Sequence, residues 1–241
     1  MQRYFSNNKI DNSFILNEDD WYHIRRVMRM TDGDKVEVVY ESKLYICKID
    51  GKFVTIEECV ESINKKIKYT LVIPILQEQK MSFVLQKATE LGVDEIIPIL
   101  TCRSKVKVEE KEDKKITRWT RICKEAAEQS KRLNIPKINN ITTIDNLDID
   151  GLKIVCSTKE KENTLKKVLK NNLKCDRMVM GIGPEGGLTE LEESKFIEKG
   201  FIPVSLGSNI MRVETVPIYL LSILNYEIME WNIWKLFWII L

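Results

Sequence analysis

The chain has 241 residues, of which 44% are apolar and 31% are charged. A chain of this size and composition buries a sizeable core, and we expect one or two soluble domains. Its formal net charge is only +2, so the overall charge neither favours nor excludes a nucleic-acid partner, which would have to be bound by local patches.

The cysteine and histidine content narrows the chemistry further. The six cysteines show no C-x-x-C spacing, and Met1–Lys9 does not resemble a signal peptide, so we expect reduced thiols and a cytoplasmic protein without a membrane partner. His23 is the only histidine, which argues against a histidine-based metal site and against a serine–histidine nucleophile. We therefore expect no metal.

The first sixty residues are typical of a small β domain. A short basic helix is predicted over Trp21–Met30, and alternating segments separated by turns at Glu41–Ser42 and Asp50–Gly51 predict a small antiparallel sheet or barrel. These segments are Lys35–Tyr40, Lys43–Ile49 and Lys52–Glu58. The polar segment 61–68 is predicted to be a linker, which gives domains over 1–68 and 69–241.

From Tyr69 onwards the pattern changes to alternating strands and helices, which predicts an α/β domain. Such a domain has a mostly parallel sheet with helices on both faces. The predicted helices are Met81–Leu91 and Arg118–Arg132. The predicted strands are Thr70–Leu76, Glu95–Leu100, Lys153–Ser157, Arg177–Ile182 and Ile202–Leu206.

Two glycine-rich turns follow the last two predicted strands, at Gly181–Glu192 and Leu206–Thr215. Thr189 and Glu192 form a capping box that starts a helix, and Gly200 is placed to end it. In parallel sheets, ligands bind beyond the carboxyl ends of the strands, where both turns are expected. The sequence therefore predicts a small-molecule pocket built largely from backbone.

The first turn also matches the G-x-G-x-x-G dinucleotide pattern, an interpretation that we reject. Pro184 removes a backbone donor, and Glu185 places a negative charge where a pyrophosphate would lie. A Walker loop is excluded because no Gly-Lys-Ser/Thr follows. The turn is better suited to a cationic or zwitterionic ligand.

Several motifs together resemble the E-type small-subunit ribosomal RNA methyltransferases, which methylate N3 of a uridine in 16S rRNA. The resemblance covers about residues 1–230, and its motifs occur in the family's order and spacing. They are M-x-R-Y-F from Met1, H-I-x-x-V-M-R-M from His23, KATELGVDEIIPI from Lys87, EAAEQSKR ending at Arg132, GIGPEGGLTELE from Gly181 and LG-x-x-I-M-R-x-E-T from Leu206.

This resemblance implies an N-terminal PUA-like barrel and a C-terminal SPOUT-class domain. The latter would have a deep trefoil knot, bind S-adenosylmethionine and form a homodimer that acts on 16S rRNA or the small ribosomal subunit. The cofactor would be held by the two glycine turns and the loop after Ser157. The implied cofactor residues are Ser157, Gly181, Gly183, Pro184, Glu185, Gly186, Gly187, Leu206, Gly207, Ile210 and Met211.

Methylation of uracil N3 requires removal of a weakly acidic proton, which a positioned base or an anion-stabilising cation assists. We expect Arg212 to stabilise the charge that develops on the base, and Glu214 or Glu185 to position the substrate or relay the proton. A structural ion pair or a helix N-terminal cap is the competing interpretation for Arg212 and Glu214. The candidate RNA-contacting residues are Arg3, His23, Arg25, Arg29, Arg103, Lys105 and Arg132.

The sequence departs from the family pattern at Asn209, where an arginine is usual, and at Ser208, Met211 and Val216. The apolar segment 231–241 has no recognised counterpart and is too short to span a bilayer. Two other functions remain open: another SPOUT activity such as ribose 2'-O methylation, and a non-catalytic RNA-binding assembly factor.

Overall fold

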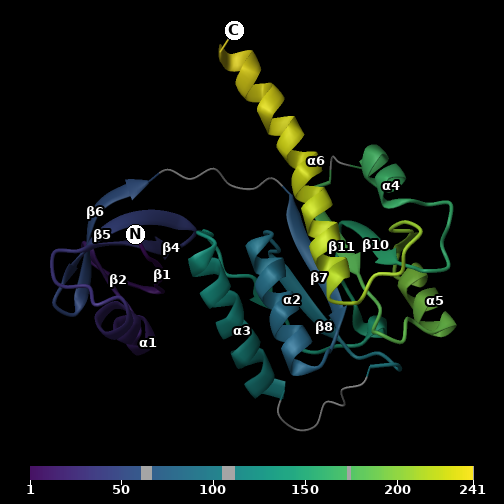
Figure 1. Cartoon of the computed structure of the whole chain (residues 1–241), viewed down its shortest axis with the longest axis horizontal. Coiled ribbons are helices and arrows are strands. Elements are labelled where there is room, and N and C mark those ends of the chain that lie inside the picture. Colours follow the sequence, from purple (N-terminus) through teal and green to yellow (C-terminus); the bar gives the residue numbers. More distant parts are fainter. Residues whose placement is uncertain (61–66, 105–111, 173–174, 241) are drawn as a thin grey trace. The chain divides into compact units, whose positions relative to one another are not determined.

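The computed structural model describes residues 1–60, 67–104, 112–172 and 175–240 (Figure 1). The chain divides into two compact units, which we describe separately. The first contains Met1–Lys65 together with Lys124–Ile135, and the second contains Lys66–Cys123 and Pro136–Leu241.

The first unit is built on a six-stranded sheet with the order β1-β4-β5-β6-β3-β2. Its pairs are antiparallel except β1 with β4, which is parallel. Glu41, Ser42 and Gly51 have positive φ angles of 49°, 59° and 58°, which confirms the two predicted hairpin turns. The strands are β1 (Arg3–Phe5), β2 (Asn8–Ile10), β3 (Ser13–Ile15), β4 (Lys35–Tyr40), β5 (Lys43–Asp50) and β6 (Phe53–Val60).

This sheet curls on itself. Ser6 directly follows β1 at one edge, yet its hydroxyl donates a 2.8 Å hydrogen bond to the carbonyl of Ile15 in β3, next to the opposite edge. The side chains that face the inside form one apolar core, which includes the fully buried Phe14, Val38 and Ile49. The curled sheet confirms the small β domain expected from the alternating segments.

The predicted helix Trp21–Met30 was correct in position but wrong in its bounds and form. The α-helix α1 spans only Glu18–Tyr22, and a π-helical turn continues it over His23–Val27. The helix begins earlier because the Asn17 side chain accepts a 2.8 Å hydrogen bond from the amide of Asp20. The π-helical turn arises because the amide of Met28 bonds to the carbonyl of His23, five residues earlier.

The second unit contains a six-stranded sheet in which every pair is parallel, as predicted. The strand order is β12-β10-β11-β7-β8-β9. The strands are β7 (Lys68–Pro74), β8 (Glu95–Ile99), β9 (Lys137–Ile138), β10 (Leu152–Cys156), β11 (Arg177–Gly181) and β12 (Ile202–Val204).

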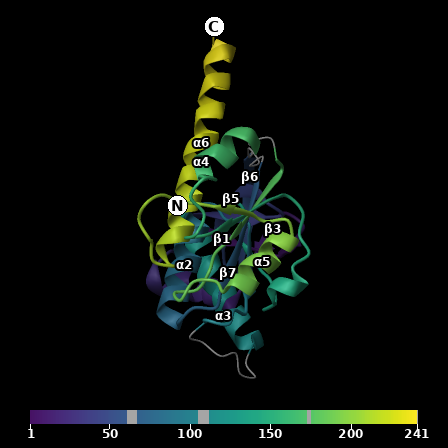
Figure 2. The same cartoon turned by 90° about the vertical axis from the view of Figure 1, so that its right-hand side faces the viewer.

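Helices cover both faces of this sheet, which confirms the predicted architecture (Figure 2). The helices α2 (Glu78–Glu90) and α6 (Thr215–Ile240) contact each other on one face. The other face is covered by α5 (Glu190–Glu198) and the 3₁₀ turn Ile144–Asn146, where Phe196 and Ile144 share a core with Val72 and Val179.

Two further helices complete the chain, α3 (Glu112–Gln129) and α4 (Leu165–Asn172). Helix α3 starts earlier than the predicted residue 118 and ends earlier than residue 132, because Lys131 adopts a left-handed conformation with φ 60°. The backbone of α6 continues to Ile240 and so includes most of the apolar segment 231–241. Within the described part of the chain, no helix is long and apolar enough to cross a membrane.

Candidate functional site

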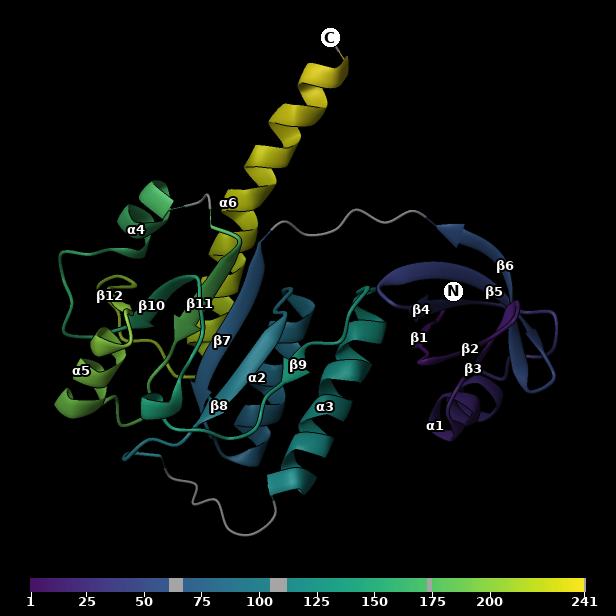
Figure 3. The ribbon, with the colours of Figure 1, turned by 180° about the vertical axis from the view of Figure 1, so that it is seen from behind.

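The strands β12, β10 and β11 are neighbours in the sheet (Figure 3). The loops at their carboxyl ends surround a cavity of about 1080 Å³. A loop leaves each of these strands and contributes to the cavity wall: residues 157–164 after β10, 182–188 after β11 and 205–214 after β12. The cavity lies entirely within the second unit. This is the edge of the sheet where the sequence predicted a pocket.

The first glycine turn links β11 to α5 through the predicted capping box. The hydroxyl of Thr189 accepts a hydrogen bond from the amide of Glu192, and the Glu192 carboxylate accepts one from the amide of Thr189. Glu192 is also buried, and it accepts a 2.7 Å hydrogen bond from the amide of Cys102. The helix ends as predicted at Gly200, which has φ +83°.

Close packing explains the glycines of this turn. A Cβ at Gly181 would lie 3.1 Å from the ring of Phe196, and one at Gly183 would lie 3.0 Å from the side chain of Leu188. These distances are tighter than ordinary van der Waals contacts, so a larger side chain at Gly181 would force the turn away from α5, and one at Gly183 would push against Leu188 within the turn. The glycines therefore hold the turn against its own helix while its backbone lines the cavity.

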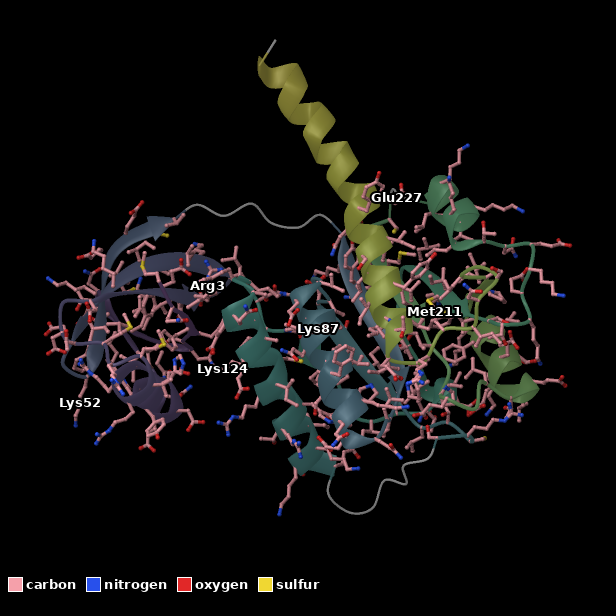
Figure 4. All side chains as sticks on the ribbon, viewed as in Figure 1. Arg3, Lys52, Lys87, Lys124, Met211 and Glu227 are labelled. Atoms are coloured by element: carbon pink, nitrogen blue, oxygen red, sulfur yellow. The ribbon has the colours of Figure 1, made fainter. Side chains whose placement is uncertain are left out.

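The second glycine turn requires an unusual backbone conformation at Gly207. Its φ of +124° lies outside the left-handed region that other residues tolerate. The turn ends where the carbonyl of Arg212 accepts a 2.9 Å hydrogen bond from the amide of Thr215, the first residue of α6. Met211 lies close to the start of α6 (Figure 4) and lines the cavity. Ile210, the preceding residue, also lines the cavity and is 84% exposed.

The loop 157–164, which follows β10, holds the second glycine turn in place. The amide of Ser157 donates to the carbonyl of Val204 at 3.0 Å, and the amide of Ser205 donates to the carbonyl of Asn163 at 2.8 Å. Glu160 folds this loop by accepting bonds from the amides of residues 161–163 at 2.7–3.0 Å, and these bonds lower the pKa of its carboxyl. Sequence reasoning identified only Ser157 of this loop.

Three charged side chains meet at the cavity wall. The ammonium of Lys80, in the first turn of α2, lies 2.8 Å from Glu185 Oε1 and 3.7 Å from Glu214 Oε2. The hydrogen bond that Lys80 donates to the Glu185 carboxylate is the largest cause that raises the pKa of Lys80. Glu214 Oε2 is buried without a hydrogen-bond donor. Sequence reasoning missed Lys80. It could have been found, because α2 starts just beyond the carboxyl end of β7, and ligands bind at that edge of a parallel sheet.

Arg212 lines the same cavity and is exposed. Among the residues described by the structure, its guanidinium has no hydrogen-bonding or ion-pairing partner. Glu214 forms a structural ion pair with Lys80, whereas Arg212 forms none among the described residues. The carbonyl of Arg212 accepts from the amides of Thr215 and Val216 at the start of α6, and its side chain stays available to a ligand.

The segment 101–104 is fastened to the first glycine turn. The Arg103 guanidinium donates a 2.9 Å hydrogen bond to the carbonyl of Gly186, and a Cβ at Gly186 would lie 3.1 Å from the Arg103 side chain. Arg103 is nevertheless exposed and lines the cavity. Lys105, the other predicted RNA contact of this segment, lies outside the described residues.

The five remaining candidate RNA contacts lie in the first unit. Arg3 is only 7% exposed, and its guanidinium binds Glu37 at 2.8 Å and the carbonyl of Arg132 at 3.1 Å, which leaves little of it for a phosphate. Arg132 donates to Asn134 at 3.0 Å and is half-buried.

The other three lie in the π-helical turn His23–Val27 and, for Arg29, just after it. The Nδ1 of His23 lies 2.9 Å from the hydroxyl of Tyr4. Arg25 binds Asp32 and the carbonyl of Gly51, and its guanidinium lies over the ring of Trp21. Arg29 is exposed, so within this set it is the side chain best placed to meet a phosphate.

In the described part of the chain, no group of three or more histidine, cysteine, aspartate or glutamate side chains is close enough to hold a metal ion. The candidate site therefore consists of glycine-rich backbone, an apolar wall and the charged groups around Lys80 and Arg212.

Comparisons with known proteins agree with this arrangement. Residues 63–225 match the family model of an RNA methyltransferase domain, and residues 16–59 match that of an RNA methyltransferase PUA domain. The ribosomal RNA small subunit methyltransferase E of Bacillus subtilis is 32% identical, over 94% of this chain and 97% of the relative. The chain belongs to the ribosomal RNA small subunit methyltransferase E family.

Solved structures of the methyltransferase E family and its neighbours have the same fold. The methyltransferase E of Neisseria gonorrhoeae, solved with bound S-adenosyl methionine, has a TM-score of 0.82 and 26% identity, over 94% of this chain and 97% of that one. A putative methyltransferase from Legionella pneumophila with bound SAM has a TM-score of 0.84 and 28% identity, over 93% of this chain and 97% of that one.

Proposed function

We propose that this protein methylates N3 of a uridine in 16S ribosomal RNA of the small subunit, with S-adenosylmethionine as the methyl donor. The observation that supports this most strongly is the cavity of about 1080 Å³, which three loops form at the carboxyl edge of a parallel sheet in a methyltransferase E chain. Pockets for ligands of cofactor size typically have volumes of about 300–1000 Å³.

The lining residues fit this cofactor. The first glycine turn lacks a backbone N–H donor at Pro184 and carries the negative charge of Glu185. Both features suit a cationic sulfonium better than a phosphate. Leu206, Met211 and Val213 supply apolar walls, and glycine-rich backbone supplies polar groups for an adenine. The cofactor residues predicted from the sequence lie on the three loops or, for Gly181, at the end of β11.

When bound, S-adenosylmethionine supplies a methyl group whose bond to sulfur breaks as the bond to uracil N3 forms, with the electron pair left on sulfur. Arg212, exposed at the cavity and without a partner among the described residues, would stabilise the negative charge on the uracil carbonyls. The buried Oε2 of Glu214 lacks a donor and would accept the N3 proton. Glu185 would position the substrate.

The RNA would be held by exposed cations of both units. Arg29 of the first unit and Arg103 of the second are exposed, and Lys105 belongs to the same proposed set. Phosphate contacts from these side chains would position the RNA, and the target base would be flipped into the cavity. His23, Arg25 and Arg132 belong to the same proposed set, and Arg3 would orient the chain around Arg132.

The remaining family features belong to the same proposal. We infer a PUA-like domain over 1–68, a methyltransferase domain over 69–241 with the trefoil knot, a homodimer and a cytoplasmic location, where the ribosomal subunits are. Light scattering of the purified protein tests the dimer: the mass of a single chain would contradict it.

The deciding experiment is methyl transfer from labelled S-adenosylmethionine to unmodified small ribosomal subunits, followed by nucleoside mass spectrometry. We expect 3-methyluridine. A ribose-methylated nucleoside would identify a different RNA methyltransferase, and cofactor binding without transfer would direct attention to Asn209. A protein that binds RNA but no cofactor would be an assembly factor. In the active enzyme, Arg212→Ala should reduce turnover and leave the cofactor Kd unchanged; unchanged turnover would refute the role of Arg212.

A further inference from the structure

Lys80 connects the two glycine turns of the site. It lies in the first turn of α2, and its ammonium contacts Glu185 from the turn after β11 and Glu214 from the turn after β12. The side chain of Lys80 is 32% exposed, and those of the two glutamates are 19% exposed. One cation thus faces two carboxylates that come from separate loops.

The other charged groups of the cavity wall are engaged elsewhere or exposed. Arg103 donates to the carbonyl of Gly186, Lys159 pairs with Glu190 at 3.3 Å and Glu193 at 3.8 Å, and Glu160 accepts three amides of its own loop. Lys161 and Arg212 are exposed. Among the described charged side chains that line the cavity, only Lys80 forms ion pairs with both Glu185 and Glu214.

This arrangement has an electrostatic consequence. Two carboxylates that share a site without a cation repel each other, and one of them then takes up a proton. The ammonium of Lys80, 2.8 Å from Glu185 and 3.7 Å from Glu214, offsets this repulsion. Lys80 donates a 2.8 Å hydrogen bond to Glu185 but lies 3.7 Å from Glu214 Oε2, which is buried and has no hydrogen-bond donor.

We propose that Lys80 is a positioning residue for the methylation reaction: its charge offsets the repulsion between Glu185 and Glu214 and holds the Glu214 carboxylate in place, so that Oε2 can accept the proton of uracil N3. This inference rests on the proposed function. In the step concerned, the N3–H bond breaks, the proton passes to Glu214 Oε2 and the electron pair stays on N3. Lys80 itself neither gains nor loses a proton.

The pH profile of kcat tests this role. Lys80→Met keeps the side-chain length and removes the cation that lies beside Glu185 and Glu214. We expect the acidic limb of the profile to move upward by about one pH unit, so that activity on that limb falls about tenfold, while the Kd for S-adenosylmethionine stays within about threefold. Lys80→Arg should restore the wild-type limb.

Lys87→Met is the matched control, because Lys87 lies on the same helix (Figure 4). Among the described residues, its ammonium pairs with Glu90 alone, at 2.8 Å. Its profile should not move. If Lys80→Met does not fold, Lys80→Gln replaces it. A wild-type enzyme that forms 3-methyluridine and a folded Lys80 variant with an unmoved acidic limb would overturn the role of Lys80. A wild-type enzyme that forms no 3-methyluridine would refute the proposed function instead.

Discussion

Removal of the Glu192 carboxylate should destabilise the second unit far more than the loss of an ordinary helix cap. Glu192 is only 5% exposed and accepts hydrogen bonds from the amide of Cys102 at 2.7 Å, the amide of Thr189 at 2.8 Å and the hydroxyl of Thr189 at 2.9 Å. Two of these bonds belong to the local capping box. The third joins α5 to a segment ninety positions earlier in the chain.

The magnitude follows from these contacts. A hydrogen bond to a charged group contributes about 1.5–3 kcal/mol, and part of this is offset by the desolvation of the buried carboxylate. We expect Glu192→Ala to lower the free energy of unfolding by about 3–5 kcal/mol. Thr189→Ala loses only the hydroxyl of the cap and should cost about 1 kcal/mol.

The Cys102 bond also links this packing to the site, because Arg103, the next residue, contacts Gly186 in the first glycine turn. Glu192→Ala should therefore weaken the binding of S-adenosylmethionine as well as stability. Urea unfolding followed by circular dichroism measures the first effect, and calorimetric titration measures the second. Glu198→Ala, at an exposed position of the same helix, is the control.

The pH dependence gives an independent test. Burial by itself would raise the pKa of Glu192, but the hydrogen bonds from Thr189 and Cys102 together lower it. The stabilisation is therefore present at neutral pH and is lost as the pH falls through the lowered pKa of the folded state. If Glu192→Ala costs no more than Thr189→Ala at neutral pH, the tertiary hydrogen bond to Cys102 contributes nothing and our reasoning is wrong.

Three further predictions concern a buried charge, a strained glycine and the RNA. Burial, and the nearby charge of Asp20, raise the pKa of Glu128 to about 7, although Lys124 counteracts them. The folded state therefore binds more protons than the unfolded state between about pH 4.5 and 7, and stability falls as the pH rises through this range. At pH 8 the free energy of unfolding of Glu128→Gln should be about 1–3 kcal/mol higher than that of the wild type, and at pH 5 the difference should be smaller. Urea titrations at both pH values measure this difference, and an equal difference at both would contradict the shift. Gly207→Ala forces a non-glycine residue to φ +124°, so it should lower the free energy of unfolding by about 1–3 kcal/mol and weaken cofactor binding. Gly51→Ala, at φ +58° with no neighbour within 4 Å, should lower it by about 1 kcal/mol and leave cofactor binding unchanged. Thermal unfolding and cofactor titration measure these effects. RNA binding should weaken steeply with salt, and Arg29→Ala should reduce the slope of log K against log salt by about one. Arg3→Ala, at a buried position, should affect stability more than this slope. A flat salt response of the wild type would refute the proposed phosphate contacts.

Much of the architecture could be predicted because it depends on residues close together in the sequence. The two hairpins follow from the alternation of the strands and from turn residues that adopt positive φ, such as Gly51. The capping box at Thr189 and Glu192 was readable for the same reason. The helix Trp21–Met30 was partly wrong because its last turn is π-helical, and no spacing of residues marks a shift from four-residue to five-residue hydrogen bonding.

The sequence by itself determined the parallel sheet, the location of the pocket at its carboxyl edge and the glycine turns. These features depend on local backbone preferences and on the periodicity of apolar residues. Only the tertiary structure decided which distant charges meet. Lys80 and Glu185 are 105 positions apart and Lys124 and Asp20 are 104 apart, yet each pair is in contact. Such pairs form because the fold closes long loops whose entropic cost is met by apolar burial, and a single sequence does not state which polar groups that burial will bring together.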